Sequence, residues 1–283
     1  MAGSLFFATF RTSLEVSTIM VASGICLPSP AALEADEVFE MGEGPSAVVF
    51  IHGLFGSPQH WRSIMADLAG RYRVLALQLP IDKQPGRRRT GIRTIEELCS
   101  HVDHLIGNLD LHRFVVCGNS LGGLVAMDMC LRHPERAAGL VLAGSAGLYE
   151  RSLTNGARPR PTREFVRTTA SDIIYNKRMI TDRLLDEWHD AITDRDYVRF
   201  VLRLSRATRD RNVEAQLDKL KLPTLMIWGR NDAVTPPSVA EAFQRRIDGS
   251  ELRFIDNCGH APNLEQPAAF ARMLQEFLPS CFS

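Results

Sequence analysis

In Val115-Val116-Cys117-Gly118-Asn119-Ser120-Leu121-Gly122-Gly123-Leu124, an apolar run ends at glycines around a single serine, and apolar residues then return at helical spacing. This pattern predicts a strand, a sharp turn and a helix rather than an ordinary glycine-rich turn. A serine in such a turn can be held in a strained backbone conformation that exposes its hydroxyl above the sheet, provided that glycines at 118 and 122 let strand and helix pass closely. Ser120 is therefore a candidate nucleophile.

Short apolar runs alternate with helical patterns on both sides of this segment. The runs predicted to be buried strands are residues 46–51, 74–79, 114–117, 139–143, 223–228 and 252–255. Thr94 followed by Glu97 predicts a capping box at the start of one intervening helix, and Ser57 before Pro58 is expected to cap another. The alternation predicts an α/β fold, a mostly parallel sheet with helices on both faces and ligands bound beyond the carboxyl ends of the strands.

The alternation is interrupted between residues 149 and 220, where helical spacing replaces strand-like runs. Ile180, Leu184, Trp188 and Ile192 step by four. We therefore expect a helical lid at 149–220 between two parts of a core domain, 46–148 and 221–283, with a leader and the first strands in 1–45. The arginines of the lid are expected to form a solvated outer face rather than a substrate clamp; they include Arg163, Arg167, Arg199, Arg203 and Arg206.

Composition narrows the classes of function. The chain has 283 residues, 45% of them apolar, with 33 basic and 33 acidic side chains. The balanced charge argues against nucleic acid or an anionic membrane as the main partner.

The apolar run 16–27 is too short to span a bilayer, and Glu15 argues against a signal peptide, so we expect a cytoplasmic protein, with export the less favoured alternative. The oligomeric state stays open. Six cysteines without C-x-x-C pairs predict reduced thiols, and neither a metal nor a cofactor is expected.

Three residues with catalytic potential, Ser120, Asp232 and His260, each follow a predicted parallel strand. Since the carboxyl ends of parallel strands share one edge of the sheet, these side chains are expected to converge. A serine hydroxyl needs a base within hydrogen-bond reach, and the base needs a carboxylate to hold its tautomer. The order serine, acid, histidine is also the order associated with the nucleophile elbow. Asp256 is a competitor for the acid, but it lies on the histidine's own approach.

An oxyanion hole requires backbone donors near Ser120. The N–H of Leu121 is one candidate, and the turn after strand 46–51 supplies a second from Leu54, with Phe55 as the alternative. His52 in that turn is interpreted as a histidine that braces the loop. The histidines predicted on helices away from the strand ends are interpreted as structural or surface residues: His101, His104, His133 and His189.

Four motifs together resemble the α/β-hydrolase superfamily with a helical lid, over residues 46 to 278. They are His52-Gly53, Gly118-Asn119-Ser120-Leu121-Gly122-Gly123, Gly229-Arg230-Asn231-Asp232 and Gly259-His260-Ala261-Pro262. The resemblance implies that a serine at the position of Ser120 is acylated, that Asp232 orients His260, and that the lid shapes an acyl or alcohol pocket. The turn Gln78-Leu79-Pro80-Ile81-Asp82 departs from the Asp-x-x-Gly-x-Gly often found there.

The leading hypothesis is a serine hydrolase, carboxylesterase-like, that cleaves small or medium carboxylic esters through an acyl-enzyme. One alternative is a carbon-carbon bond hydrolase of aromatic meta-cleavage products, which has a similar elbow. Those enzymes often carry tryptophan after the histidine, where this chain has Ala261, and a glycine-rich segment where it has Leu54-Phe55-Gly56. A second alternative is a non-catalytic ligand-binding protein on the same fold. Epoxide hydrolases and haloalkane dehalogenases are disfavoured because their elbow nucleophile is aspartate.

Overall fold

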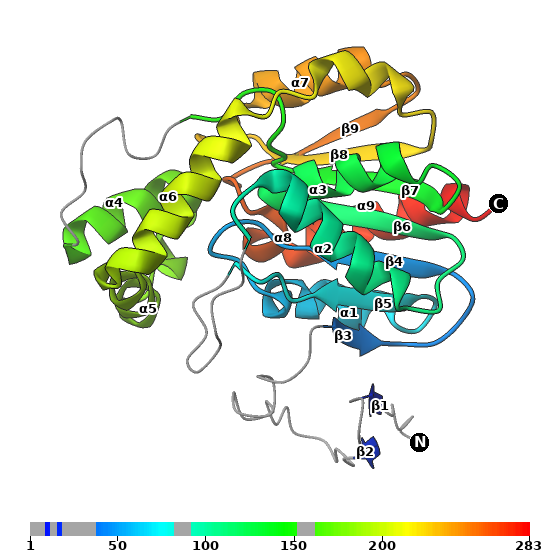
Figure 1. Cartoon of the computed structure of the whole chain (residues 1–283), viewed down its shortest axis with the longest axis horizontal. Helices are drawn as coiled ribbons and strands as arrows, with labels where there is room; N and C mark the ends of the chain where they lie inside the picture. Colours follow the sequence, from blue (N-terminus) through cyan, green and yellow to red (C-terminus); the bar gives the residue numbers. More distant parts are fainter. Residues whose placement is uncertain (1–8, 12–15, 19–37, 82–91, 152–161) are drawn as a thin grey trace.

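Seven strands form the central sheet in the order β3-β5-β4-β6-β7-β8-β9 (Figure 1). Their bounds are Val38–Met41 (β3), Ala47–Ile51 (β4), Arg73–Leu77 (β5), Phe114–Asn119 (β6), Ala137–Ala143 (β7), Thr224–Gly229 (β8) and Glu251–Ile255 (β9). β3 pairs antiparallel with β5, and the other neighbouring strands are parallel. The predicted α/β fold with a mostly parallel sheet is confirmed.

The computed structural model describes residues 9–11, 16–18, 38–81, 92–151 and 162–283. Near the start of the chain, β1 (Thr9–Arg11) and β2 (Val16–Thr18) pair antiparallel with each other. Most of the apolar run 16–27 and the end of the turn at Asp82 lie outside the described residues. Within them, no helix is both long and apolar enough to cross a membrane.

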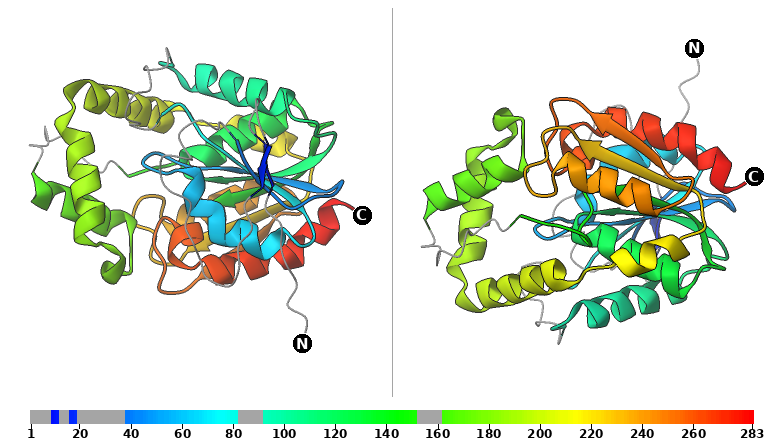
Figure 2. Two further views of the ribbon diagram at one scale, coloured as in Figure 1. Left: turned by 90° about the horizontal axis from the view of Figure 1, so that it is seen from below. Right: turned by 90° about the horizontal axis from the view of Figure 1, so that it is seen from above.

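Helices cover both faces of the sheet (Figure 2). One face carries α1 (Arg62–Leu68) and α9 (Pro267–Cys281), and the other carries α2 (Ile95–Gly107), α3 (Leu121–Arg132) and α7 (Pro237–Arg246). Because successive side chains of a strand point to opposite faces, Val49 and Ile51 join the core under α2 and α3, while Val48 and Phe50 join the core under α1 and α9. This double burial explains the continuous apolar runs in the sequence.

Two helix starts differ in how their first N–H groups are satisfied. At α2 the Thr94 side chain accepts from the N–H of Glu97, whose own side chain accepts from Thr94, so the predicted capping box is present. The prediction that Ser57 caps a helix is wrong. A 3-10 turn, η2 (Pro58–Trp61), precedes α1, and there the carbonyl oxygen of Ser57, not its side chain, accepts from the N–H of His60 at 3.1 Å.

Three helices, α4 (Arg163–Ile173), α5 (Asp182–Thr193) and α6 (Arg195–Asp210), form an insertion at one end of the sheet (Figures 1 and 2). Their first turns are capped by side chains of Thr162, Thr181 and Asp194. The following 3-10 turn, η4 (Glu214–Lys219), returns to the core, where Leu217 and Leu220 are buried. The helices of the insertion thus occupy residues 163–210.

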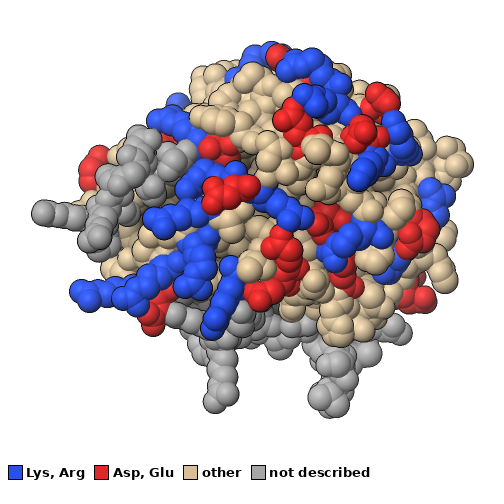
Figure 3. Space-filling model, turned by 45° about the horizontal axis from the view of Figure 1, so that its top comes forward, with Lys and Arg blue, Asp and Glu red and all other residues tan. Residues whose placement is uncertain are grey.

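Several arginines of the insertion are exposed and paired with neighbouring carboxylates. Arg163 donates to Asp182 and Asp186 at 2.7 and 2.9 Å, and Arg199 donates to Asp196 at 2.9 Å. Basic and acidic side chains also lie side by side over much of the face in Figure 3. This arrangement agrees with a solvated outer face.

The cysteines of the described residues are free thiols in buried positions: Cys99, Cys117, Cys130, Cys258 and Cys281. Burial raises the pKa of these thiols, for example that of Cys130 to about 12. The prediction of reduced, core-filling cysteines is confirmed for Cys99, Cys117 and Cys130. The described part of the chain contains no group of three or more His, Cys, Asp or Glu side chains arranged to hold a metal ion.

Candidate active site

The turn between β6 and α3 places Ser120 in a strained backbone conformation, with φ 54° and ψ −120°. Two glycines make the turn possible. A Cβ at Gly118 would lie 2.1 Å from the carbonyl oxygen of Gly122, and a Cβ at Gly122 would lie 2.2 Å from the carbonyl oxygen of Ile51. Both distances are impossible contacts with backbone atoms, so strand and helix approach as closely as the sequence predicts.

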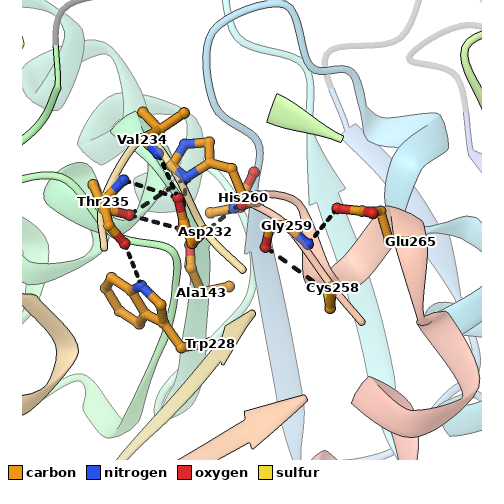
Figure 4. A network of polar contacts seen from close by, with 10 residues as sticks. Ala143, Trp228, Asp232, Val234, Thr235, Cys258, Gly259, His260 and Glu265 are labelled. Atoms are coloured by element: carbon orange, nitrogen blue, oxygen red, sulfur yellow. Dashed lines mark hydrogen bonds and ion pairs between the residues drawn. The ribbon is translucent and has the colours of Figure 1, made fainter. Parts of the chain in front are cut away.

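Asp232 follows β8 and His260 follows β9, and their side chains meet at the edge of the sheet (Figure 4). His260 Nδ1 lies 2.9 Å from Asp232 Oδ2. The other carboxylate oxygen, Oδ1, accepts from the backbone N–H groups of Val234 and Thr235 at 2.8 and 2.9 Å, and the Thr235 hydroxyl donates to Oδ2 at 2.9 Å. The carboxylate is thus fixed by donors on every side.

This network determines the state of the His260 ring. Since Asp232 can only accept when ionised, Nδ1 carries the proton, and Nε2 is left with a lone pair. Burial by itself lowers the pKa of His260. The charge and hydrogen bond of Asp232 raise this pKa, as do the charges of Glu150 and Glu265, and the net shift is upward. Asp256 is exposed and pairs with Arg230, away from His260.

Ser120 and His260 line the same cavity of about 490 Å³, which lies between the sheet edge and the helical insertion. The described residues show no hydrogen bond between the Ser120 hydroxyl and the His260 ring. Such contacts are often long before a substrate binds and tighten when it does. The elbow is nevertheless tied to the histidine, because the Asn119 side-chain amide donates to the carbonyl oxygens of Ala143 and His260 at 2.9 and 3.1 Å.

The loop after β4 lies against Ser120 and holds the predicted oxyanion donors. A Cβ at Gly53 would lie 3.0 Å from both the carbonyl oxygen of Asn119 and Ser120 Cβ, which is tighter than ordinary contacts, so the missing side chain lets the loop pack closely on Ser120. Leu54 and Phe55 line the cavity, and Leu121 begins α3 directly after Ser120. Among the hydrogen bonds of the described residues, the N–H groups of Leu54, Phe55 and Leu121 have no partner.

His52 has a bracing position in this loop. Its Nε2 accepts from the N–H of Leu79 at 3.1 Å, which leaves Nδ1 as the donor to the carbonyl oxygen of Gly53 at 2.9 Å. Burial lowers the pKa of His52 to about 4, partly opposed by that backbone hydrogen bond, so the ring stays neutral. The bond from Leu79 joins the loop to the segment that follows β5, and the bond to Gly53 holds the ring within the loop.

The wall of the cavity is mostly apolar, and the helical insertion supplies much of it. Residues of the insertion that line it include Phe165, Ile173, Ile174, Trp188, Ile192, Tyr197, Val198, Val201 and Leu202. The Trp188 ring stacks on Phe55 with centroids 5.4 Å apart, which connects the insertion to the loop after β4. Arg195 and Arg199 reach the wall as exposed residues, and Glu150 contributes a carboxyl group.

A carboxylate without any signal in the sequence pattern joins the histidine loop to the insertion. Glu265, in α8 (Pro262–Glu265), accepts from the N–H of Gly259 at 2.8 Å through Oε1 and from the N–H groups of Tyr175 and Asn176 at 2.8 and 3.0 Å through Oε2. The N–H of His260 also donates to the carbonyl oxygen of Ile173 at 2.8 Å. Three of these hydrogen bonds clamp the end of α4 and the two residues Tyr175 and Asn176 to the His260 loop, and the fourth, from Gly259, holds the Glu265 side chain in place.

Other residues of the site also gave no clear signal in the sequence. Thr235 and Asn119 position Asp232 and His260 but lie within ordinary turn patterns. Glu150 lies in a polar stretch whose orientation cannot be read from spacing.

Comparison with known proteins agrees with this architecture. The model of the alpha/beta hydrolase family matches residues 48–273. A 2-hydroxy-6-oxo-2,4-heptadienoate hydrolase of Pseudomonas putida is 26% identical over 285 residues, covering 95% of this chain and 98% of that enzyme. A 2-hydroxy-6-oxononadienedioate/2-hydroxy-6-oxononatrienedioate hydrolase of Cupriavidus pinatubonensis is 29% identical over 258 residues, covering 84% of this chain and 89% of that enzyme.

Solved structures show the same likeness. A meta-cleavage product hydrolase from Pseudomonas fluorescens superimposes with a TM-score of 0.73 at 26% identity, over 86% of this chain and 93% of that one. The family match spans the sheet from Val48 of β4 onward, the elbow and the loops that carry Asp232 and His260. The chain belongs to the alpha/beta hydrolase family.

Proposed function

We propose that this hydrolase cleaves carboxylic esters through an acyl-enzyme on Ser120, with His260 as the base and Asp232 as its orienting acid. The observation that carries the proposal is the placement of a strained serine and a carboxylate-held histidine on one apolar cavity. We also propose that the helical insertion acts as a lid that shapes the pocket for the acyl or alcohol part.

In the first half of the reaction, Ser120 Oγ attacks the ester carbonyl carbon while His260 Nε2 takes the hydroxyl proton. The carbonyl π electrons move to oxygen, and the N–H groups of Leu54 and Leu121 stabilise the resulting oxyanion, with Phe55 as the alternative donor. The tetrahedral intermediate collapses by breaking the bond to the alcohol oxygen, which receives the proton from His260. The acyl group then remains on Ser120.

In the second half, a water molecule attacks the acyl carbon and gives its proton to His260 Nε2. Collapse of this intermediate releases the carboxylic acid and returns the proton to Ser120. Asp232 keeps the imidazolium oriented in both halves, because its four accepted hydrogen bonds fix it in place. No group outside the chain is needed for proton transfer.

The relatives favour a second candidate, hydrolysis of a carbon-carbon bond in meta-cleavage products. The substrates in the names of the two sequence relatives, a heptadienoate and nona-di- or trienedioates, are carboxylates. In this chain the cavity wall carries the carboxyl group of Glu150, whereas the cations that the described residues bring to it, Arg195 and Arg199, are exposed. A nearby carboxylate repels an anionic substrate, and this supports the ester proposal.

A direct comparison of substrates tests the proposal. The kcat/KM for p-nitrophenyl esters of increasing acyl length is measured beside turnover of a yellow dienol meta-cleavage product, with Ser120→Ala as the control. Ester hydrolysis lost in Ser120→Ala, with little or no dienol turnover, is expected. Faster turnover of the dienol would assign the carbon-carbon reaction instead. If no ester is hydrolysed and ligands stabilise wild type and Ser120→Ala equally, the chain is a binding protein.

A further inference from the structure

Glu150 brings a carboxyl group to the wall of the catalytic cavity, on the same surface as Ser120 and His260. Its side chain is half-buried, and the atom Oε2 is fully buried without a hydrogen-bond partner among the described residues. Buried polar atoms are nearly always paired, and an unpaired carboxyl oxygen is costly. A donor that arrives with the substrate would satisfy this oxygen once the Glu150 side chain turns it toward the cavity that the residue lines.

The backbone around Glu150 is held against the catalytic loops. The N–H of Ala146 donates to the carbonyl oxygen of Ser120 at 3.1 Å, and the carbonyl oxygen of Gly147 accepts from the N–H of Val213 at 2.9 Å. On the other side of Glu150, the N–H of Arg151 donates to the carbonyl oxygen of Val234 at 2.7 Å. The carboxyl group is therefore presented at a fixed place beside the loop that carries Asp232.

The charges around Glu150 fit a substrate contact rather than a structural ion pair. Burial raises the pKa of the Glu150 carboxyl group. The positive charges of His260 and Arg209 lower this pKa and the negative charge of Asp232 raises it, so that the net shift is upward. Neither His260 nor Arg209 forms an ion pair with it among the described residues. The carboxyl group thus remains free to accept a hydrogen bond within the cavity.

We propose that Glu150 is a specificity-determining acceptor, which selects esters or lactones that carry an N–H or O–H donor near the scissile carbonyl and rejects those that carry a carboxylate. This inference rests on the proposed ester hydrolysis. A site built to accept a hydrogen bond discriminates strongly against a substrate that lacks the donor, because its own polar atom is then left unpaired.

Two matched pairs of substrates test the inference with the full-length enzyme. The p-nitrophenyl esters of N-acetylglycine and 4-oxopentanoate differ by an N–H in place of a CH₂. Mono-p-nitrophenyl adipate and p-nitrophenyl heptanoate are similar in length and differ by a carboxylate. For each enzyme the readout is the ratio of kcat/KM within a pair, which does not depend on the fraction of protein that is folded.

Two variants separate hydrogen bonding from charge. Glu150→Met removes the acceptor and is expected to lower the kcat/KM ratio of the N-acetylglycine ester to the 4-oxopentanoate ester about tenfold. Both Glu150→Met and Glu150→Gln are expected to raise the kcat/KM ratio of the adipate ester to the heptanoate ester about tenfold. Glu150→Gln keeps an acceptor oxygen, so it should retain part of the N–H preference. The matched control Glu241→Gln, on the exposed face of α7, should leave both ratios at the wild-type values.

The outcomes distinguish the two levels of the argument. If wild type hydrolyses the heptanoate ester but both ratios are unchanged in the Glu150 variants, the inference is overturned and the proposed ester hydrolysis stands. If folded wild type hydrolyses none of the four esters, the proposed function fails and the inference fails with it. If Glu150→Met does not fold, the adipate ratio in Glu150→Gln decides the inference.

Discussion

Glu265 offers a sharp test of how the helical insertion and His260 are connected. Replacement by alanine would remove the acceptor for the N–H of Gly259, which is buried, and for those of Tyr175 and Asn176, which lie in exposed residues. An unpaired buried donor costs about 1–3 kcal/mol, while a donor that can turn to water loses about 0.5–1 kcal/mol. The free energy of unfolding should therefore fall by about 2–5 kcal/mol.

Glu265→Gln refines this expectation. The glutamine side chain keeps one acceptor oxygen, but its NH₂ group would face either the Gly259 donor or the pair from Tyr175 and Asn176, so two donors would oppose each other. The loss should be about 1–3 kcal/mol. In both variants kcat should fall roughly tenfold to a hundredfold, because small displacements of a catalytic group slow the reaction strongly. His260 follows Gly259 directly and shares the clamp.

The assay combines urea unfolding with kcat and KM for a p-nitrophenyl ester, measured without denaturant on folded protein. Glu241→Gln is the control for the loss of a carboxylate on an exposed helix face. An unfolding free energy within about 0.5 kcal/mol of wild type in Glu265→Ala would refute the clamp, since it would mean that its hydrogen bonds contribute nothing. A stability loss with an unchanged kcat would show that Glu265 supports the fold but does not position His260.

Two further variants test the elbow and the acid. Gly118→Ala should destabilise the protein by about 1–3 kcal/mol or more, because the new Cβ would lie 2.1 Å from a backbone atom. Gly107→Ala is the control, since open space surrounds its Cβ, and it should be neutral or stabilising. Thermal unfolding of both variants tests the difference. Asp232→Asn should lower kcat by about 10⁴-fold, since an amide cannot accept four hydrogen bonds. Asp232 raises the pKa of His260, so loss of its charge should shift the acid limb of kcat/KM to lower pH than in wild type. An unshifted limb would exclude His260 as the titrating base.

The sequence contained enough information to predict the parallel strands β4 to β9 and the three candidate catalytic residues, but not the antiparallel edge strand β3. Strands buried on both faces appear as continuous apolar runs, as at 47–51, and Thr94 with Glu97 marks a helix start through contacts only three residues apart. Ser120, Asp232 and His260 could be grouped because parallel strands end on a common edge, which is a rule of topology that needs no knowledge of side-chain packing.

Contacts that depend on how elements pack could not be predicted in this way. Glu265 meets Tyr175 across 90 positions of sequence, and nothing in the local spacing of either residue indicates it. Whether the side chains of Glu150 and Trp188 face the cavity depends on where the insertion lies over the sheet. Ser57 was mispredicted for a different reason. Serine is a favourable capping residue, but the segment after Ser57 forms a 3-10 turn, and the Ser57 side chain makes no capping hydrogen bond to it.

The most direct test of the central claim is covalent labelling of Ser120. A fluorophosphonate probe phosphonylates a serine activated by a neighbouring base, with fluoride as the leaving group. Mass spectrometry of the digested protein should locate one adduct on Ser120, absent from Ser120→Ala and formed far more slowly in His260→Ala. A folded wild-type protein that forms no adduct at Ser120, or one labelled equally fast without His260, would contradict the proposed serine hydrolase.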